Sequence, residues 1–252
     1  MDLHGIKGKT AVVTGAASGM GLLLCQELVR RGANAVLADI DPEAAEKAAQ
    51  AINAESRNGG RAISAACDVR RYDEVCAVRD LAVSTFGCID ILVTLAGGAE
   101  MRMCHAEGEF PDVPIEVYDW GLDVNLKGQF YFAHAVMKQM REQKSGTILC
   151  IGSITGWEGG GGGSVAYACA KSAAMNGLVR SLAQYGSQYG IRCCCVAPGP
   201  VLTRPGMASM PTALKRAAEP IELVNLMLYL IADEGNFFDG VTLLMDGGRS
   251  VL

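Results

Sequence analysis

A tyrosine and a lysine four residues apart are suited to proton transfer. Tyr167 and Lys171 lie in a long helical pattern after Ser153, and on a helix such residues share one face. A free tyrosine has a pKa of about 10, and lowering it to about 7 takes roughly 4 kcal/mol. A unit charge about 4 Å away supplies about that much at an effective dielectric of about 20. The spacing therefore suffices for a proton-transfer group, although it also occurs on solvated helix faces.

Length and composition predict one domain that spans residues 1–252. Half of the 252 residues are hydrophobic, which suffices for one large core. The net charge is −5 and the basic residues are scattered, so we expect no nucleic-acid surface and no polybasic membrane patch. No apolar run approaches the roughly 20 residues of a membrane span, and residues 1–9 lack the order of a signal peptide. We expect no membrane partner.

The ten cysteines are dispersed through apolar segments, apart from the run at residues 193–195. There is no CxxC motif, and the three histidines are far apart in the sequence. We expect buried, reduced thiols and no metal site in a cytoplasmic protein. A metal or redox centre is the alternative interpretation.

The first segments have the parts of a dinucleotide-binding cradle. Residues 10–14 are typical of a buried strand, a glycine turn with Gly15, Gly19 and Gly21 follows, and a helix is expected over 19–31. Glycines let the backbone approach a pyrophosphate, and the helix N-terminus offers free N–H groups. Glycine turns also serve packing alone, but the flanking strand and helix favour cofactor binding.

The second expected strand, at residues 35–39, ends in Asp39. A carboxylate at this position can accept hydrogen bonds from the ribose hydroxyls of adenosine. A plain helix cap is the other interpretation, but Asp41 before Pro42 already fills that role. No Lys or Arg directly follows Asp39, so a 2′-phosphate would meet an uncompensated negative charge. The sequence therefore favours NAD(H) over NADP(H).

Strands and helices alternate along the whole chain. Further strands are expected at residues 62–66, 89–95, 147–151, 191–196 and 241–245. Helices are expected at residues 42–57, from about 70 to 86, from about 115 to 144, around Tyr167, at 208–218 and at 221–232. This alternation predicts an α/β fold with a doubly wound parallel sheet and helices on both faces.

Ligands of such sheets bind beyond the carboxyl ends of the strands. Six residues with possible roles in binding or chemistry fall at these ends: Gly15, Asp39, Asp68, Gly97, Ser153 and Pro198. Their convergence is independent of the choice of Tyr167. It is the main argument for one functional site.

These residues and their order resemble the short-chain dehydrogenase/reductase family over essentially the whole chain. The matching pieces are Thr14 to Gly21, Asp39, Asp68-Val69, Asn125 in Val-Asn-Leu-Lys-Gly, Ser153, Tyr167-x-x-x-Lys171, Pro198-Gly199 with Thr203, and Asp246-Gly247-Gly248. Together and in this order they are highly specific. The resemblance implies a Rossmann fold, a nicotinamide cofactor, and hydride transfer between a secondary alcohol and a ketone.

The resemblance also implies roles for single residues. Tyr167 would be the proton donor and acceptor, Lys171 would lower its pKa and bind the nicotinamide ribose, Ser153 would bond the substrate oxygen, and Asn125 would hold a water. Family members are usually tetramers, less often dimers. The implied NAD-binding residues are Gly15, Ser18, Gly19, Met20, Gly21, Asp39, Ile40, Asp68, Val69, Ala96, Gly97, Tyr167, Lys171, Pro198, Gly199, Val201 and Thr203.

The sequence departs from the family pattern in two places. The usual Asn-Asn-Ala-Gly after the fourth strand is Thr94-Leu95-Ala96-Gly97 here, which puts local rigidity in doubt. Five glycines at residues 159–163 lengthen the segment between Ser153 and Tyr167. Such a loop leaves room for a bulky substrate or is merely a flexible insertion.

Clues to the substrate are few. The loop at residues 100–114 carries Arg102 and reaches the mouth of the site, or forms solvated surface or a subunit contact. Met207, Met210 and Leu214 line an apolar wall of the pocket, or are ordinary helix packing. Steroid-like, sugar-derived and hydroxy-acyl substrates all remain open.

Three other functions compete with an active dehydrogenase. A silent NAD-binding sensor or assembly protein is indicated only by the altered pair at residues 94–95, and the intact Ser153, Tyr167 and Lys171 argue against it. An enoyl reductase would place its lysine further from the tyrosine. A sugar-nucleotide epimerase would need a larger C-terminal substrate region.

Overall fold

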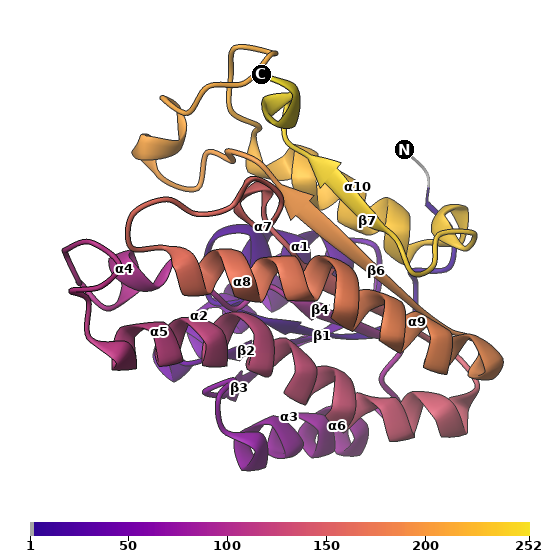
Figure 1. Ribbon diagram of the computed structural model, residues 1–252. Coiled ribbons are helices and arrows are strands. Elements are labelled where there is room, and N and C mark those ends of the chain that lie inside the picture. Colours follow the sequence, from indigo (N-terminus) through magenta and orange to yellow (C-terminus); the bar gives the residue numbers. More distant parts are fainter. Residues whose placement is uncertain (1–2) are drawn as a thin grey trace.

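Seven parallel strands form one sheet in this computed structural model, which describes residues 3–252 (Figure 1). The strand order is β3-β2-β1-β4-β5-β6-β7, so the order in which the chain adds strands reverses between β1 and β4, which pair in parallel. The strands are β1 Thr10–Thr14, β2 Asn34–Asp39, β3 Ala62–Ala66, β4 Ile91–Thr94, β5 Gly146–Ile151, β6 Ile191–Pro198 and β7 Thr242–Met245. The predicted α/β fold with a doubly wound parallel sheet is confirmed.

Helices cover both faces of the sheet (Figure 1). The α-helices are α1 Gly19–Arg30, α2 Pro42–Glu55, α3 Tyr72–Phe86, α4 Glu100–Met103, α5 Ile115–Leu122, α6 Gly128–Gln143, α7 Ile154–Glu158, α8 Val165–Ala173, α9 Val179–Gly186 and α10 Pro220–Ile231. Helices α1, α2 and α10 pack on one face, and α3, α6 and α9 on the other. Two π-helical segments, Asp123–Lys127 and Ala174–Leu178, join α5 to α6 and α8 to α9.

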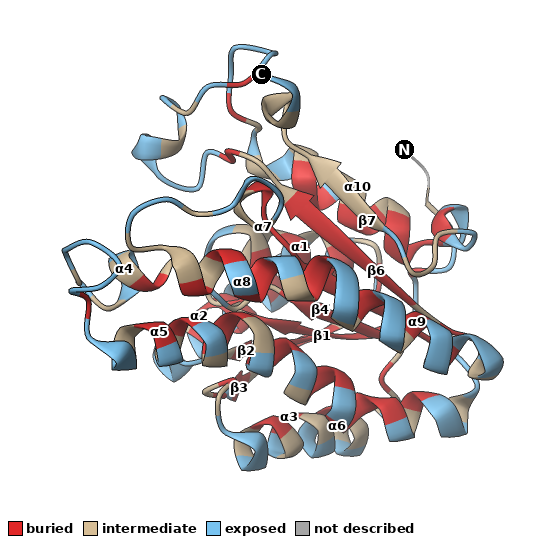
Figure 2. Cartoon of the chain, viewed as in Figure 1, coloured by how far each residue is buried: buried red, intermediate tan, exposed pale blue. Residues whose placement is uncertain are grey.

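The central strands are buried and mostly apolar because both of their faces are covered. Side chains alternate between the two cores, as they must on a strand. In β1, Val13 packs with α1 and α10, whereas Val12 packs with α3 and α6. The cysteine run follows the same rule: Cys193 and Cys195 lie in one core and Cys194 in the other. Figure 2 shows β6 buried along its length.

One predicted helix is wrong. Residues 208–218 form turns after the short 3-10 helix Pro205–Met207, and Val201 pairs with Ala218 through an isolated bridge. Pro211 lacks an N–H and disfavours the helical conformation of the residue before it, so a helix cannot run through this position. The segment instead folds back over the end of β6.

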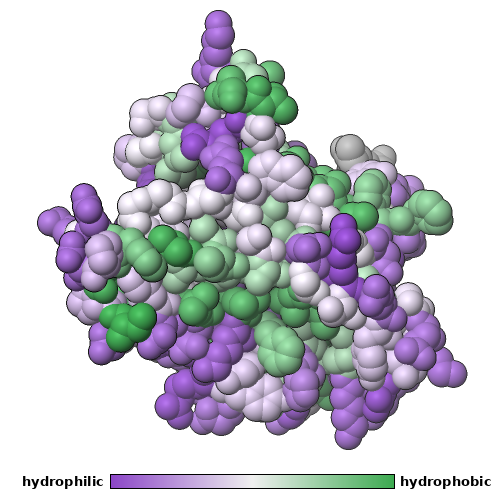
Figure 3. Space-filling view, in the orientation of Figure 1, coloured by the Kyte–Doolittle hydropathy of each residue, from purple (hydrophilic) through white to green (hydrophobic). Residues whose placement is uncertain are grey.

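The face formed by α8, α5 and α6 carries exposed apolar side chains (Figure 3). On α5 and α6 these include Ile115, Leu122 and Phe130, which are 64%, 39% and 51% exposed. None of the helices within residues 3–252 is long and apolar enough to span a bilayer. The ten cysteines form no disulfide, and six of them are buried.

Candidate active site

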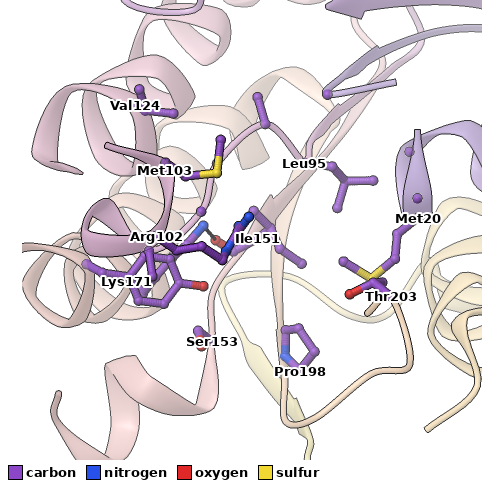
Figure 4. Close-up of a pocket in the computed structure, with 18 of the residues that line it drawn as sticks. Met20, Leu95, Arg102, Met103, Val124, Ile151, Ser153, Lys171, Pro198 and Thr203 are labelled. Atoms are coloured by element: carbon purple, nitrogen blue, oxygen red, sulfur yellow. Dashed lines mark hydrogen bonds between the residues drawn. The ribbon is translucent and has the colours of Figure 1, made fainter. Parts of the chain in front are cut away.

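A cavity of about 530 Å³ opens at the carboxyl ends of the strands (Figure 4). It lies where a doubly wound sheet is expected to bind ligands. Among the residues predicted for the site, all but Asn125 line it: Gly15, Ser18, Gly19, Met20, Gly21, Asp39, Ile40, Asp68, Val69, Ala96, Gly97, Ser153, Tyr167, Lys171, Pro198, Gly199, Val201 and Thr203. The structure therefore brings segments from the whole length of the chain to one place.

The glycine turn after β1 has two kinds of glycine. A Cβ on Gly15 would lie 2.8 Å from Ala96 Cα, and one on Gly21 would collide with Gly15 O, so these two allow close packing. Gly19 has a positive φ of +55° and open space where a Cβ would stand. Ser18, the N-cap of α1, makes no side-chain capping bond. The helix N-terminus therefore presents N–H groups to the cavity, which suits a phosphate.

Two carboxylates stand at the end of the cavity formed by β2 and β3. Asp39 Oδ2 accepts a 2.9 Å hydrogen bond from Ala17 N, and its Oδ1 accepts one from Asp41 N at 3.1 Å. Asp39 thereby braces the glycine turn. Asp68 forms an ion pair with Arg70 at 2.6 Å, and the hydrogen bond from Arg70 lowers the pKa of Asp68. The guanidinium of Arg70 beside Asp68 is thus already paired.

Tyr167 and Lys171 share one face of α8, as their spacing predicts. Lys171 Nζ lies 5.6 Å from the centre of the Tyr167 ring. Burial nevertheless raises the pKa of Tyr167 above its usual value, and this outweighs the neighbouring Ser153 hydroxyl and the charges of Arg204 and Arg102, which lower the pKa. The structure therefore differs from the expectation of a lowered tyrosine pKa, because removal of the phenol from water dominates.

Lys171 is 2% exposed, and its Nζ donates a 3.1 Å hydrogen bond to Ile151 O at the end of β5. Burial lowers the pKa of Lys171 to about 8. A lysine with this pKa exchanges its proton near physiological pH. Its charge is held at the floor of the cavity, close to the phenol.

Ser153 lies two residues after Ile151, the carboxyl end of β5. Its Oγ accepts a 3.1 Å hydrogen bond from Thr155 N and so caps α7, and the same residue lines the cavity with Tyr167. The cap fixes the hydroxyl, because a rotation about Cβ would break the bond to Thr155. A substrate oxygen would meet two oriented hydroxyl groups at this position.

Asn125 lies behind the cavity wall, in the π-helical segment before α6. Its amide donates to Gly98 O and Gly121 O, both at 2.9 Å, and its Oδ1 accepts from Gly98 N at 3.0 Å. A Cβ on Gly97 would lie 2.5 Å from that Oδ1. Asn125 therefore fixes the loop after β4, and its implied role in holding a water stays a prediction.

The altered pair after β4 has a partner that sequence reasoning missed. Thr94 Oγ1 donates to Gln129 Oε1 at 2.8 Å, and Ile151 N donates to the same oxygen at 3.0 Å. Gln129 Nε2 donates to Asn125 O at 2.6 Å and to Ile151 O at 3.1 Å. This buried amide joins the ends of β4 and β5 to α6, so the local rigidity put in doubt by the sequence is restored.

A second missed residue is Glu100 on α4, which is fully buried. Its Oε1 accepts a 3.1 Å hydrogen bond from Tyr167 N in the first turn of α8, and its Oε2 has no partner within residues 3–252. A carboxylate at a helix N-terminus stabilises that end. No sequence signal identifies this contact, because the two residues are 67 positions apart.

The outer part of the cavity is lined by Met207 and Met210, as predicted for an apolar wall. Leu214 does not line it and is 66% exposed. The glycine loop at residues 159–163 also stays outside the cavity wall, and a Cβ on Gly163 would lie 2.5 Å from Met101. Arg102 does line the cavity.

Known proteins resemble this chain in sequence and in fold. The profile of the family described as short chain dehydrogenase matches residues 9–213. Oxidoreductase UcpA of Salmonella typhimurium is 34% identical over 263 residues, covering 98% of this chain and 96% of that protein. The 3-alpha-(or 20-beta)-hydroxysteroid dehydrogenase of Mycobacterium tuberculosis is 35% identical over 250 residues, covering 96% of this chain and 89% of that protein. The structure of NAD+-bound xylitol dehydrogenase superposes with a TM-score of 0.85 at 27% identity, covering 96% and 99%. The chain therefore belongs to the short chain dehydrogenase family and is an oxidoreductase.

Proposed function

We propose that the protein is an NAD(H)-dependent dehydrogenase that interconverts a secondary alcohol and a ketone. The observation that carries this proposal is that Ser153, Tyr167 and Lys171 line one cavity, which a glycine turn also lines, with Lys171 Nζ 5.6 Å from the centre of the tyrosine ring. A phenol held next to a hydroxyl and an ammonium is suited to move one proton on and off a substrate oxygen. The substrate is a small molecule.

The residues around the cavity fit a dinucleotide. The open space at Gly19 and the uncapped start of α1 would hold the pyrophosphate, and Asp39 would accept hydrogen bonds from the adenosine ribose. Arg70 is paired with Asp68 and so is not free to bind a 2′-phosphate, which supports NAD(H) over NADP(H). When bound, the nicotinamide supplies the acceptor or donor of the hydride.

The side chains of the protein handle the proton. In the oxidative direction, Ser153 Oγ orients the alcohol oxygen and Tyr167 Oη accepts its proton. Lys171 stabilises the phenolate by its charge, and Arg204 and Arg102 act in the same sense because their charges lower the pKa of Tyr167. In the reductive direction, Tyr167 donates the proton to the carbonyl oxygen.

The test is turnover of secondary alcohols with NAD, followed by the absorbance of NADH, in the wild type and in Tyr167→Phe. This substitution keeps the ring and removes the proton carrier, so turnover should fall by about 10²-fold or more while NAD still binds. Tyr185→Phe is the matched control, because Tyr185 on α9 is 41% exposed and lies outside the cavity. Near-normal turnover of Tyr167→Phe would favour a silent binding protein or another catalytic group.

We also propose a closed oligomer, a tetramer or a dimer, that functions in the cytoplasm. The exposed apolar side chains on α5 and α6 support an association through this face. Ten unpaired cysteines are suited to a reducing compartment.

A further inference from the structure

Two arginines from different segments line the cavity. Arg102 lies on α4, after β4, and Arg204 directly precedes the 3-10 helix Pro205–Met207, after β6. Both side chains are exposed to solvent. Figure 4 shows Arg102 on the same side of the cavity as Lys171 and Ser153, with Met20 on the other side.

Neither arginine forms an ion pair or a side-chain hydrogen bond with any residue from 3 to 252. Most of the other arginines are committed: Arg30, Arg31, Arg70, Arg71, Arg79, Arg216 and Arg249 all pair with carboxylates. The carboxylate nearest in sequence, Glu100, is bonded to the backbone of Tyr167. The positive charges of Arg102 and Arg204 are therefore available to an anion, with no protein ion pair to break.

Arg102 lies at the reacting end of the cavity, on the side of Lys171 and Ser153 (Figure 4), and Arg204 lines the same cavity. The charges of both arginines lower the pKa of Tyr167, in agreement with this placement. The opposite end carries Asp39 and Asp68. The cavity is thus basic beside Tyr167 and acidic where the adenosine is expected.

The cofactor does not account for Arg102. Its pyrophosphate is expected at the start of α1, next to Met20, and Figure 4 shows this residue across the cavity from Arg102. A 2′-phosphate would lie near Asp39 at the end of β2. An anion beside Tyr167 must therefore belong to the substrate.

We propose that the substrate is a secondary alcohol or ketone that carries an oxyanion group, a carboxylate or a phosphate, bound by Arg102 and Arg204. This rests on the function proposed above. Arginine is suited to such a group because its planar fork donates two parallel hydrogen bonds to it. Met103, Met207 and Met210 add an apolar wall for the rest of the molecule.

The experiment compares three alcohols of one carbon skeleton: 3-hydroxyoctanoate, its methyl ester, and 2-hydroxyoctyl phosphate. The purified wild type is assayed with NAD, and binding of each alcohol is measured separately by thermal shift. We expect kcat/KM for an anionic alcohol to exceed that for the ester at least tenfold, which is about 1.4 kcal/mol. Preference for the carboxylate or for the phosphate identifies the group.

Arg102→Gln and Arg204→Gln should each raise KM for the preferred anion at least fivefold and leave KM for the ester within twofold, because the ester lacks the group that the arginines bind. A loss of kcat through the pKa of Tyr167 should fall equally on the anion and the ester. Arg180→Gln, on the exposed surface of α9, is the control and should change neither KM. Equal kcat/KM and equal binding for the ester and the anions would overturn the inference. So would arginine variants in which KM for NAD rises and KM for the anion does not. Turnover of the neutral ester by the wild type tests the proposed dehydrogenase activity by itself. A failure of the anion site can therefore be told apart from a failure of the proposed function.

Discussion

Gln129 allows a sharp test of how the catalytic end of the sheet is held. The ladder between β4 and β5 ends at the pair Thr94 and Cys150. One residue further, Ile151 N donates to Gln129 Oε1 at 3.0 Å, so the side-chain amide takes the place of the missing strand. Gln129→Leu keeps a side chain of similar size. It removes all four hydrogen bonds of the Gln129 amide, which join it to Thr94, to Asn125 and twice to Ile151.

The expected cost follows from the groups left behind. Thr94 keeps Leu149 O as an acceptor at 3.3 Å, and Ile151 O keeps the bond from Lys171 at 3.1 Å. Ile151 N has no such alternative and becomes a buried unpaired donor, which costs about 1–3 kcal/mol. At roughly 2–4 °C per kcal/mol for a domain of this size, the midpoint of thermal unfolding should fall by about 2–12 °C.

Thermal unfolding followed by circular dichroism measures this shift at one protein concentration. Gln50→Leu on α2 is the matched control, since Gln50 is exposed and, within residues 3–252, its side chain bonds only with Glu46. The free energy of unfolding should change by no more than about 0.5 kcal/mol. Gln129→Leu should also reduce turnover, because Ile151 O positions Lys171. If the midpoint of Gln129→Leu equals that of the wild type, the bridging role assigned to Gln129 is wrong.

Three further predictions concern the cofactor, the buried lysine and the assembly. Catalytic efficiency should be at least tenfold higher with NAD than with NADP, and Asp39→Ala should reduce this ratio. Equal catalytic efficiency of the wild type with NAD and NADP would contradict the predicted preference. Burial lowers the pKa of Lys171 from 10.5 to about 8, so between these values the unfolded chain holds more protons and stability rises with pH. Lys171→Met should therefore reduce turnover and NAD affinity. Its free energy of unfolding at pH 7 should nevertheless exceed that of the wild type, by roughly 3 kcal/mol at most. Denaturant titrations should show this difference in the free energy of unfolding shrink as the pH approaches 10.5. A difference that does not depend on pH would show that burial of the charged lysine is not its cause. Light scattering at micromolar concentration should give a dimer or a tetramer, and a stable monomer would exclude the proposed association.

The fold was predictable because local patterns and global topology agree. Apolar runs bounded by glycine and polar residues predicted the strands to within a few residues, since buried parallel strands carry no polar face. The error at residues 208–218 arose where a helical apolar spacing was given more weight than Pro211. The helix α7 was missed because its five residues are too short to show a period.

The site was predictable only where motifs bring their own geometry. The glycine turn and the four-residue spacing of Tyr167 and Lys171 specify local structure, so their arrangement follows from the sequence. Glu100 and Gln129 act through contacts 67 and 22 positions away, which no local pattern specifies. The pKa of Tyr167 is likewise set by tertiary burial, which the spacing argument did not include.

One carbonyl group connects the stability of the sheet with the chemistry of the site. Ile151 O accepts hydrogen bonds from both Gln129 and Lys171, at 3.1 Å each. The lysine is thus held by the same end of β5 that the amide of Gln129 stabilises, and a displacement of that strand end moves the charge beside Tyr167. The unusual Thr94-Leu95 pair is compatible with an active site because Gln129 supplies the bonds there. Positions 94 and 129 therefore act as one unit, and the effect of a substitution at either depends on the residue at the other.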